Sequence, residues 1–299
     1  MQVIDLNLNE FLKRSKTMID QQLPTYISEL KAPPSLKEAM LYSISAGGKR
    51  IRPVLLLATL QAFNQDEKVG IDVACAIEML HTYSLIHDDL PAMDDDDLRR
   101  GMPTNHKVYG EAMAILAGDA LLTYSFQLIS DMDVPSITDQ MKIKLIQEFA
   151  KASGPEGMVG GQVADIKGEK KRLSLQELEY VHHHKTGDLL TYSVLAGAIL
   201  AGANNIELEK LRLFGKELGL VFQIKDDILD VEGDVSTIGK PIGSDSDRDK
   251  STYPSLLSMD GAKSKLFEHT KRAKEYLYSI NLENTLLMEI TDYIAERDH

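Results

Sequence analysis

Two groups of aspartates stand out because each lies at the end of an apolar stretch of chain. The groups are Asp88, Asp89 and Asp94, and Asp226, Asp227 and Asp230. Carboxylates in a context that is otherwise buried need a partner, because an unpaired charge away from water is costly. Oxygen ligands select a hard cation such as Mg²⁺, which typically binds one or two carboxylates together with the phosphates of a ligand. The two groups therefore predict a metal site for a polyanionic substrate.

The spacing within each group is compatible with this chemistry. Asp226 and Asp230 are four residues apart on one helix face, where like charges repel unless a cation lies between them. Pro91 cannot donate the hydrogen bond that would continue its helix, so the helix should end and Asp94 can return toward Asp88. The alternative is a solvated acidic helix end. The presence of two aspartate groups, each in apolar surroundings, argues against this alternative.

Basic residues that a diphosphate needs occur in several segments, although the formal net charge is −13. They are Lys49, Arg50 and Arg52 after Gly47-Gly48, Arg99 and Arg100 after the first aspartate group, Lys185 with Thr186, and Lys240. The glycines permit close backbone approach to a ligand, and arginine forks match phosphate oxygens. Taken singly, each is better explained as an ordinary charge, either exposed, paired with a nearby aspartate or at a helix start.

The histidines give a weaker signal. His81 lies two helical turns before Asp88, on roughly the same face, and is either a ligand-binding or a core histidine. Consecutive helical residues point about 100° apart, so at most one of the run 182–184 can face a common site.

The elements that must position these residues are predicted to be helices, because apolar residues recur at steps of three and four through most of the chain. Proline and glycine divide the sequence into about ten helices. No break is long and polar enough to be a linker, so residues 1–299 are predicted to form a single domain. The segments after residues 91 and 233 are predicted to be functional loops, and the 233–254 loop and the C-terminal helix a lid.

Composition excludes several classes of protein. With 33 basic and 46 acidic residues, the surface does not favour nucleic acid or anionic lipid. The single cysteine, Cys75, excludes an internal disulfide and fits a reducing, cytoplasmic location. The N-terminal residues show no export signal, and the run 189–203 is shorter than the roughly 20 residues that span a bilayer. No membrane span is expected.

Small residues mark one further helix, predicted from about Ala112 to Ser130. Ala114, Ala117 and Gly118 allow another helix to approach closely. A core contact and a dimer interface are equally compatible with this pattern.

The motifs together resemble the trans-polyprenyl diphosphate synthase family over nearly the whole chain. The resemblance rests on GGKRIRP, LIHDDLPAMDDDDLRRG, GGQVAD, HHHKTG, FQIKDDILD and KSTYP in this order. Four residues between Asp89 and Asp94 are typical of its bacterial farnesyl diphosphate synthase subgroup. The resemblance implies an all-α bundle around a central cavity, usually a homodimer. It also implies Mg²⁺-dependent condensation of isopentenyl diphosphate with dimethylallyl or geranyl diphosphate.

The resemblance also implies residue roles. Isopentenyl diphosphate would be held by Lys49, Arg52, His81 and Arg100, and the allylic diphosphate by Arg99, Lys185, Thr186, Gln223 and Lys240. Magnesium, as three ions once diphosphate is bound, would be ligated by Asp88, Asp94, Asp165 and Asp226. Asp89, Asp227 and Asp230 would serve catalysis either as direct ligands or by orienting them.

Product length is implied by the residues just before Asp88. Tyr83 and Ser84 lie five and four residues back, about 6 to 7.5 Å along the helix. A bulky Tyr83 would stop chain growth at C15, although ordinary aromatic packing explains it equally well. Geranylgeranyl diphosphate synthase and a non-catalytic synthase subunit are the alternatives. A terpene cyclase is disfavoured by the sequence DDILD.

Overall fold

The computed structural model describes residues 7–169, 171–232, 250–283 and 285–298. These residues are predominantly helical, with one antiparallel pair of two-residue strands, β1 (Leu98–Arg99) and β2 (Met102–Pro103). The predicted all-α fold is confirmed. The chain divides into two compact units, Met1–Leu57 with Glu67–Ile146 and Ala58–Asp66 with Gln147–His299. The single domain stays a prediction, and each unit is described by itself.

The first unit consists of helices with short connections. They are α1 (Leu8–Glu29), α2 (Pro34–Ser45), η1 (Glu67–Gly70), α4 (Ile71–Asp88), α5 (Asn105–Tyr109) and α6 (Glu111–Ser130), while α3 (Ile51–Ala62) and α7 (Asp139–Ser153) cross the boundary between the units. The side chain of Asn7 accepts a hydrogen bond from the N–H of Asn9 and so caps α1. The buried residues Ile19, Leu23 and Ile27 then recur every fourth position, as expected for one face of a helix.

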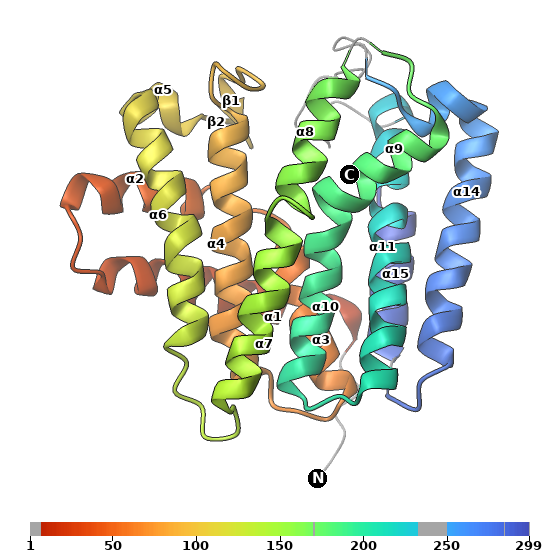
Figure 1. Cartoon of the computed structure of the whole chain (residues 1–299), viewed down its shortest axis with the longest axis horizontal. Coiled ribbons are helices and arrows are strands. Elements are labelled where there is room, and N and C mark those ends of the chain that lie inside the picture. The colour runs from red at the N-terminus through yellow and green to blue at the C-terminus, as the bar shows by residue number, and fades with distance from the viewer. Residues whose placement is uncertain (1–6, 170, 233–249, 284, 299) are drawn as a thin grey trace. The chain divides into compact units, whose positions relative to one another are not determined.

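The core of this unit lies around α4, which packs along α6 (Figure 1). Every residue from Val73 to Leu80 is buried. Gly118 on α6 lies against the ring of His87, because a Cβ there would stand 2.2 Å from its Nε2. The absent side chain therefore sets how closely the two helices approach at the aspartate end of α4.

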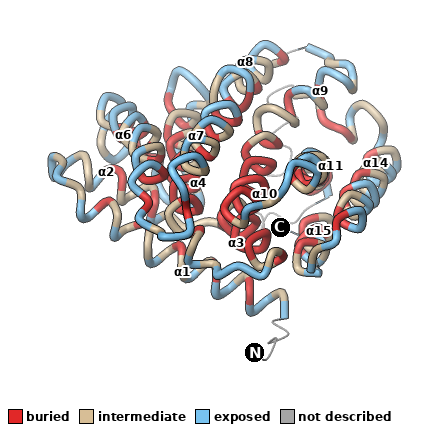
Figure 2. Tube along the Cα trace, turned by 60° about the horizontal axis from the view of Figure 1, so that its bottom comes forward, coloured by how far each residue is buried: buried red, intermediate tan, exposed pale blue. Residues whose placement is uncertain are grey.

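The second unit is also helical. It contains α8 (Met158–Gly168), α9 (Leu175–His182), η2 (His183–Gly187), α10 (Asp188–Leu200), α11 (Asn205–Glu232), α14 (Tyr253–Tyr278) and α15 (Thr285–Glu296). Helix α10 is buried along nearly its whole length (Figure 2). Helix α11 packs against α10 and α14. Reciprocal hydrogen bonds between Ser174 and Glu177 start α9, and those between Thr252 and Ser255 start α14.

Two helices in the described part of the chain are long and apolar enough to cross a membrane by length and composition. They span residues 67–88 and 111–130, and the first is two-thirds buried inside the protein. Core helices of globular proteins meet the same criterion, so neither one argues for a membrane protein.

Candidate active site

The first aspartate group lies where α4 ends and the chain turns back. Helix α4 ends at Asp88, and the N–H of Asp94 donates to the carbonyl oxygen of Asp88 at 2.8 Å. The predicted return of Asp94 is therefore confirmed for the backbone. Asp88 and Asp94 are both partly exposed, whereas Asp89 between them is buried.

The buried Asp89 carboxylate is paired with Arg99. Nε of Arg99 donates to Oδ1 of Asp89 at 2.8 Å, and Nη2 donates to the same oxygen. A forked arginine held by a buried carboxylate has a fixed position. Both residues, together with Arg100, line a cavity of about 30 Å³. Asp89 thus orients one of the predicted substrate-binding cations.

Two of the residues predicted to bind isopentenyl diphosphate, Arg52 and Arg100, lie close enough to His81 to affect its ionisation. Burial, together with Arg52 and Arg100, lowers the pKa of His81 well below its ordinary value, so its ring is neutral at pH 7. Nη1 of Arg100 donates to the carbonyl oxygen of Gly47. Lys49 is exposed in the same loop. Three cations and a neutral imidazole therefore belong to one region of the first unit.

The predicted chain-length residues lie within α4. Tyr83 is only 8% exposed, and its ring meets the ring of His87 edge-on with 5.4 Å between centroids. Burial, and secondarily Asp88, raise the pKa of the Tyr83 hydroxyl, so it stays protonated. The hydroxyl of Ser84 donates to the carbonyl of His81 at 2.8 Å. Tyr83 is thus a rigid aromatic group one and a half turns from Asp88.

A second set of residues with possible metal-ligand atoms lies beyond the first aspartate group. Oxygens of Asp95 and Asp97 and a ring nitrogen of His106 lie within 4.8 Å of one another. Asp97 is paired with Lys107 at 2.7 Å, and Thr104 lies 3.1 Å from Nδ1 of His106. Both carboxylates are exposed, and the lysine competes with any cation for Asp97.

In the second aspartate group, Asp227 differs from the other two aspartates in its environment. Asp227 is 4% exposed, accepts the N–H of Tyr253 at 2.8 Å and lies 3.4 Å from Nε2 of His182. Asp226 and Asp230, four residues apart, remain partly exposed. Asp227 therefore secures the start of α14, while the two outer aspartates stay partly accessible to solvent.

Replacement of Asp227 by alanine is expected to destabilise the protein. The buried N–H of Tyr253 would lose its acceptor, which costs about 2 kcal/mol of unfolding free energy. Asp227→Asn keeps an acceptor oxygen and should cost less. Urea unfolding curves of both variants measure the difference, and equal stability of Asp227→Ala and wild type would contradict this role.

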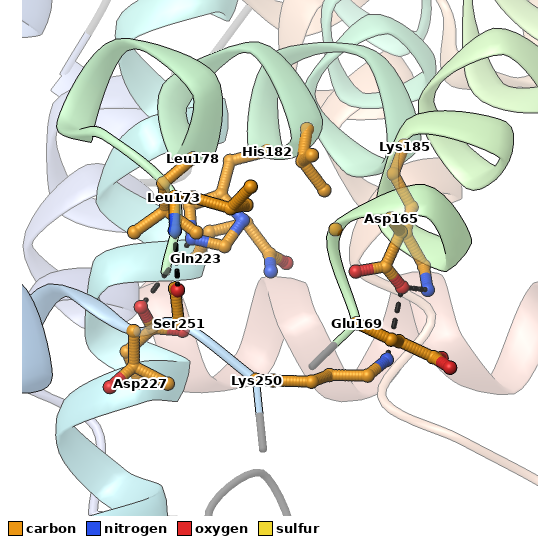
Figure 3. A pocket seen from close by; sticks show the side chains of 13 residues that line it. Asp165, Glu169, Leu173, Leu178, His182, Lys185, Gln223, Asp227, Lys250 and Ser251 are labelled. Carbon is orange, nitrogen blue, oxygen red and sulfur yellow. Dashed lines mark hydrogen bonds and ion pairs between the residues drawn. The ribbon is translucent and has the colours of Figure 1, made fainter. Parts of the chain in front are cut away.

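A cavity of about 120 Å³ in the second unit gathers several of the predicted residues (Figure 3). Lys185 and Lys250 reach the same oxygen of Asp165, at 2.6 and 3.0 Å. Burial alone would raise the pKa of Asp165, but the two lysines outweigh it and lower this pKa, so the carboxylate is ionised. Gln223 and Asp227 line the same cavity.

The position of Lys185 depends on close backbone packing of the π-helical turn η2. A Cβ on Gly161 of α8 would stand 2.1 Å from the N atom of Lys185, and one on Gly219 of α11 would stand 2.7 Å from Cα of Gly187. Only glycine permits contacts this short. Single π turns are frequent at functional sites, and here one carries Lys185 and the buried Thr186.

The three consecutive histidines have different surroundings. Only His182 lines the cavity with Lys185. Burial and Lys216 lower the pKa of His183 to about 4, so it is neutral at pH 7. Nδ1 of His184 lies 2.7 Å from Asp188.

Two basic residues near the candidate site were not singled out from the sequence. Lys250 belongs to the KSTYP segment, where the motif itself was the available signal. Nη2 of Arg297 donates to Asp226 at 2.5 Å and to the carbonyl of Phe222 at 3.1 Å, and no sequence signal links residues so far apart. Lys240 and residues 233–249 of the predicted lid lie outside the described part of the chain. The lid role of the C-terminal helix stays a prediction.

The chain is similar to known proteins over nearly its whole length. The profile of the family described as polyprenyl synthetase matches residues 33–281. A farnesyl diphosphate synthase of Geobacillus stearothermophilus is 56% identical over 294 residues, which cover 98% of this chain and 99% of that protein. A chloroplastic geranylgeranyl pyrophosphate synthase of Capsicum annuum is 48% identical over 272 residues, which cover 90% of this chain and 73% of that protein.

A solved structure is similar over the same length. The apo crystal structure of an FPP/GFPP synthase from Zymomonas mobilis has a TM-score of 0.86 and 35% sequence identity, covering 97% of this chain and 99% of that one.

Proposed function

Because the chain belongs to the polyprenyl synthetase family, we propose that it is a farnesyl diphosphate synthase. It condenses isopentenyl diphosphate head-to-tail with dimethylallyl or geranyl diphosphate to give the C15 product. The observation that carries the proposal is that each unit combines aspartates with basic side chains. Asp88 and Asp94 accompany Arg99 and Arg100 in the first unit. In the second, Asp165 and Asp227 line one cavity with Lys185 and Lys250, and Asp226 and Asp230 lie on the helix that carries Asp227.

The carboxylates fit magnesium in their chemistry. Asp88, Asp94 and Asp226 supply partly exposed oxygen donors, which is the ligand type Mg²⁺ prefers. Asp165 is ionised, the form that a metal requires, and because Lys185 and Lys250 both contact its Oδ2, its Oδ1 is the oxygen we propose for a metal. We propose these four as ligands for three ions. When bound, the ions supply Lewis-acid stabilisation of the charge on the departing diphosphate.

The basic residues would form two groups, one for each substrate. Lys49, Arg52 and Arg100 are proposed to hold isopentenyl diphosphate with neutral His81 as a hydrogen-bonding partner. Arg99, Lys185, Thr186, Gln223 and Lys240 are proposed to hold the allylic diphosphate. Fixed cations that face the charge developing on the leaving group lower the barrier to its departure.

The proposed reaction has three bond changes. The allylic C–O bond breaks, and the double bond of isopentenyl diphosphate attacks the resulting carbocation carbon. The attack leaves a tertiary carbocation on the isopentenyl unit. The adjacent CH₂ on the diphosphate side then loses a proton to the departing diphosphate, and the electrons of that C–H bond form the new double bond. A site that excludes water prevents capture of the carbocation.

Two alternatives are distinguished by specific features. A geranylgeranyl diphosphate synthase would make a C20 product, and the bulky Tyr83 before Asp88 disfavours it. A non-catalytic synthase subunit would normally lack one aspartate group, whereas both are intact in this sequence.

The test is incubation of labelled isopentenyl diphosphate with either dimethylallyl or geranyl diphosphate, with and without Mg²⁺, followed by chromatography of the dephosphorylated products. A C15 alcohol that forms only with Mg²⁺ is expected. A C20 product would favour the geranylgeranyl alternative, and no product with either primer would refute the proposed activity.

We further propose that the enzyme is a cytoplasmic homodimer, with α6 in the interface. Leu116 is 54% exposed on this apolar helix and Ile115 is also exposed, which is unusual for large apolar side chains unless a partner covers them. Leu116→Glu is expected to convert a dimer into monomers of 33.3 kDa, because it would bury a charge without a partner. Light scattering after size exclusion measures the mass. A wild-type monomer, or a variant that stays dimeric, would contradict the proposed interface.

A further inference from the structure

Arg50 lies between two residues with proposed roles in binding isopentenyl diphosphate, yet its own side chain is buried. Lys49 before it is exposed and Arg52 after it is partly exposed, whereas Arg50 is 4% exposed. Its backbone has φ of +54°, a left-handed conformation that is uncommon for a residue with a side chain. An unusual backbone conformation persists only where its surroundings fix it.

The guanidinium of Arg50 joins three helices of the first unit. Nε donates to Oδ1 of Asp20 on α1 at 2.8 Å, and Nη1 donates to Oε1 of Glu78 on α4 at 2.6 Å. Nη2 donates to the carbonyl oxygen of Ile44 near the end of α2 at 2.8 Å. Two carboxylates thus neutralise one buried cation, which makes its burial tolerable. They also leave it unsuited to serve as a diphosphate ligand.

The partners of Arg50 place the loop next to the other proposed substrate residues. Glu78 lies three residues before His81, so the two share one face of α4. Gly47 and Gly48 both have positive φ. A Cβ on Gly48 would stand 2.8 Å from the guanidinium carbon of Arg100. Nη1 of the same arginine donates a hydrogen bond to the carbonyl oxygen of Gly47. The loop is therefore held on one side by Arg100 and anchored to the core by Arg50.

We propose that Arg50 is a positioning residue, which anchors the 47–52 loop so that Lys49 and Arg52 meet the diphosphate of isopentenyl diphosphate. This inference rests on the proposed function and adds a residue to which the family resemblance gives no role. Arg50 does not touch substrate. Its loss displaces Lys49 and Arg52, which contact the diphosphate. Small displacements of binding groups weaken substrate binding strongly.

The test compares Arg50→Lys and Arg50→Gly in steady-state kinetics. Lysine keeps the positive charge but cannot make the three hydrogen bonds of the guanidinium. Glycine adopts the positive φ readily but removes the side chain and all of its contacts. For both variants we expect KM for isopentenyl diphosphate to rise about 10- to 100-fold. KM for geranyl diphosphate and kcat at saturation should stay near wild type. A general loss of structure would instead change all three values.

Two further variants keep the test decisive if the Arg50 variants are unstable. Asp20→Asn weakens one partly exposed partner of Arg50 and should raise only KM for isopentenyl diphosphate, by a few fold. The control is Arg14→Gln. Arg14 lies on α1, as Asp20 does, and forms an exposed ion pair with Glu67 of η1, so its loss should change neither KM.

The outcomes separate this inference from the proposed function. An unchanged KM for isopentenyl diphosphate in Arg50→Gly and Asp20→Asn, or equal rises for both substrates, would overturn the positioning role in an active enzyme. Absence of C15 product from the wild type would instead refute the proposed function.

Discussion

Asp88→Asn is expected to lower kcat about 10²- to 10³-fold at saturating substrate and magnesium, because asparagine keeps the shape of the side chain but removes the charge that holds a metal ion. Asp88 closes α4, and the backbone of Asp94 returns to it. Asp226→Asn in the second group is expected to have an effect of the same order. We expect the decrease in the steady-state kcat measured with labelled isopentenyl diphosphate. A single-turnover measurement then shows that the chemical step, and not product release, is slower.

The control for both variants is Glu209→Gln, an exposed residue on α11. It removes one negative charge from the same helix as Asp226 and should leave kcat unchanged. Near-normal rates for either Asp88→Asn or Asp226→Asn would remove that aspartate group from the mechanism.

Tyr83→Ala is expected to shift the main product from C15 to C20 or longer. Tyr83 lies five residues before Asp88, about 7.5 Å along the helix, where a prenyl chain that grows away from the diphosphate would meet its ring. The ring is buried and held edge-on against His87, so it does not swing aside at low cost. Chromatography of products from a long incubation measures the shift.

Tyr83→Phe is the matched control for this prediction. It removes the hydroxyl, keeps the ring, and should still stop at C15. A C15 product from Tyr83→Ala would show that Tyr83 packs in the core without limiting chain length.

The sequence predicts the helices well because their apolar spacing is local. The end of α4 at Asp88 and the return of Asp94 both follow from Pro91, a residue within the same segment. The helix predicted from about Ala112 to Ser130 begins at Glu111 and ends at Ser130 in the structure. Local steric rules are sufficient for such features.

Residue roles within each aspartate group could not be predicted, because they depend on partners distant in sequence. Asp227 differs from its neighbours since it accepts the N–H of Tyr253. Asp226 meets Arg297 near the C-terminus. Lys250 converges with Lys185 on Asp165 through tertiary packing. The spacing of residues along one helix shows which of them share a face, but it does not show what that face contacts.

The central claim is that the two aspartate groups bind the allylic diphosphate through divalent ions. Isothermal titration calorimetry with a non-ionisable thio analogue of geranyl diphosphate tests it most directly. Tight binding to the wild type in the presence of Mg²⁺, and at least tenfold weaker binding with EDTA or in Asp88→Asn and Asp226→Asn, is predicted. Equal affinity with and without Mg²⁺, unaffected by either substitution, would contradict the claim.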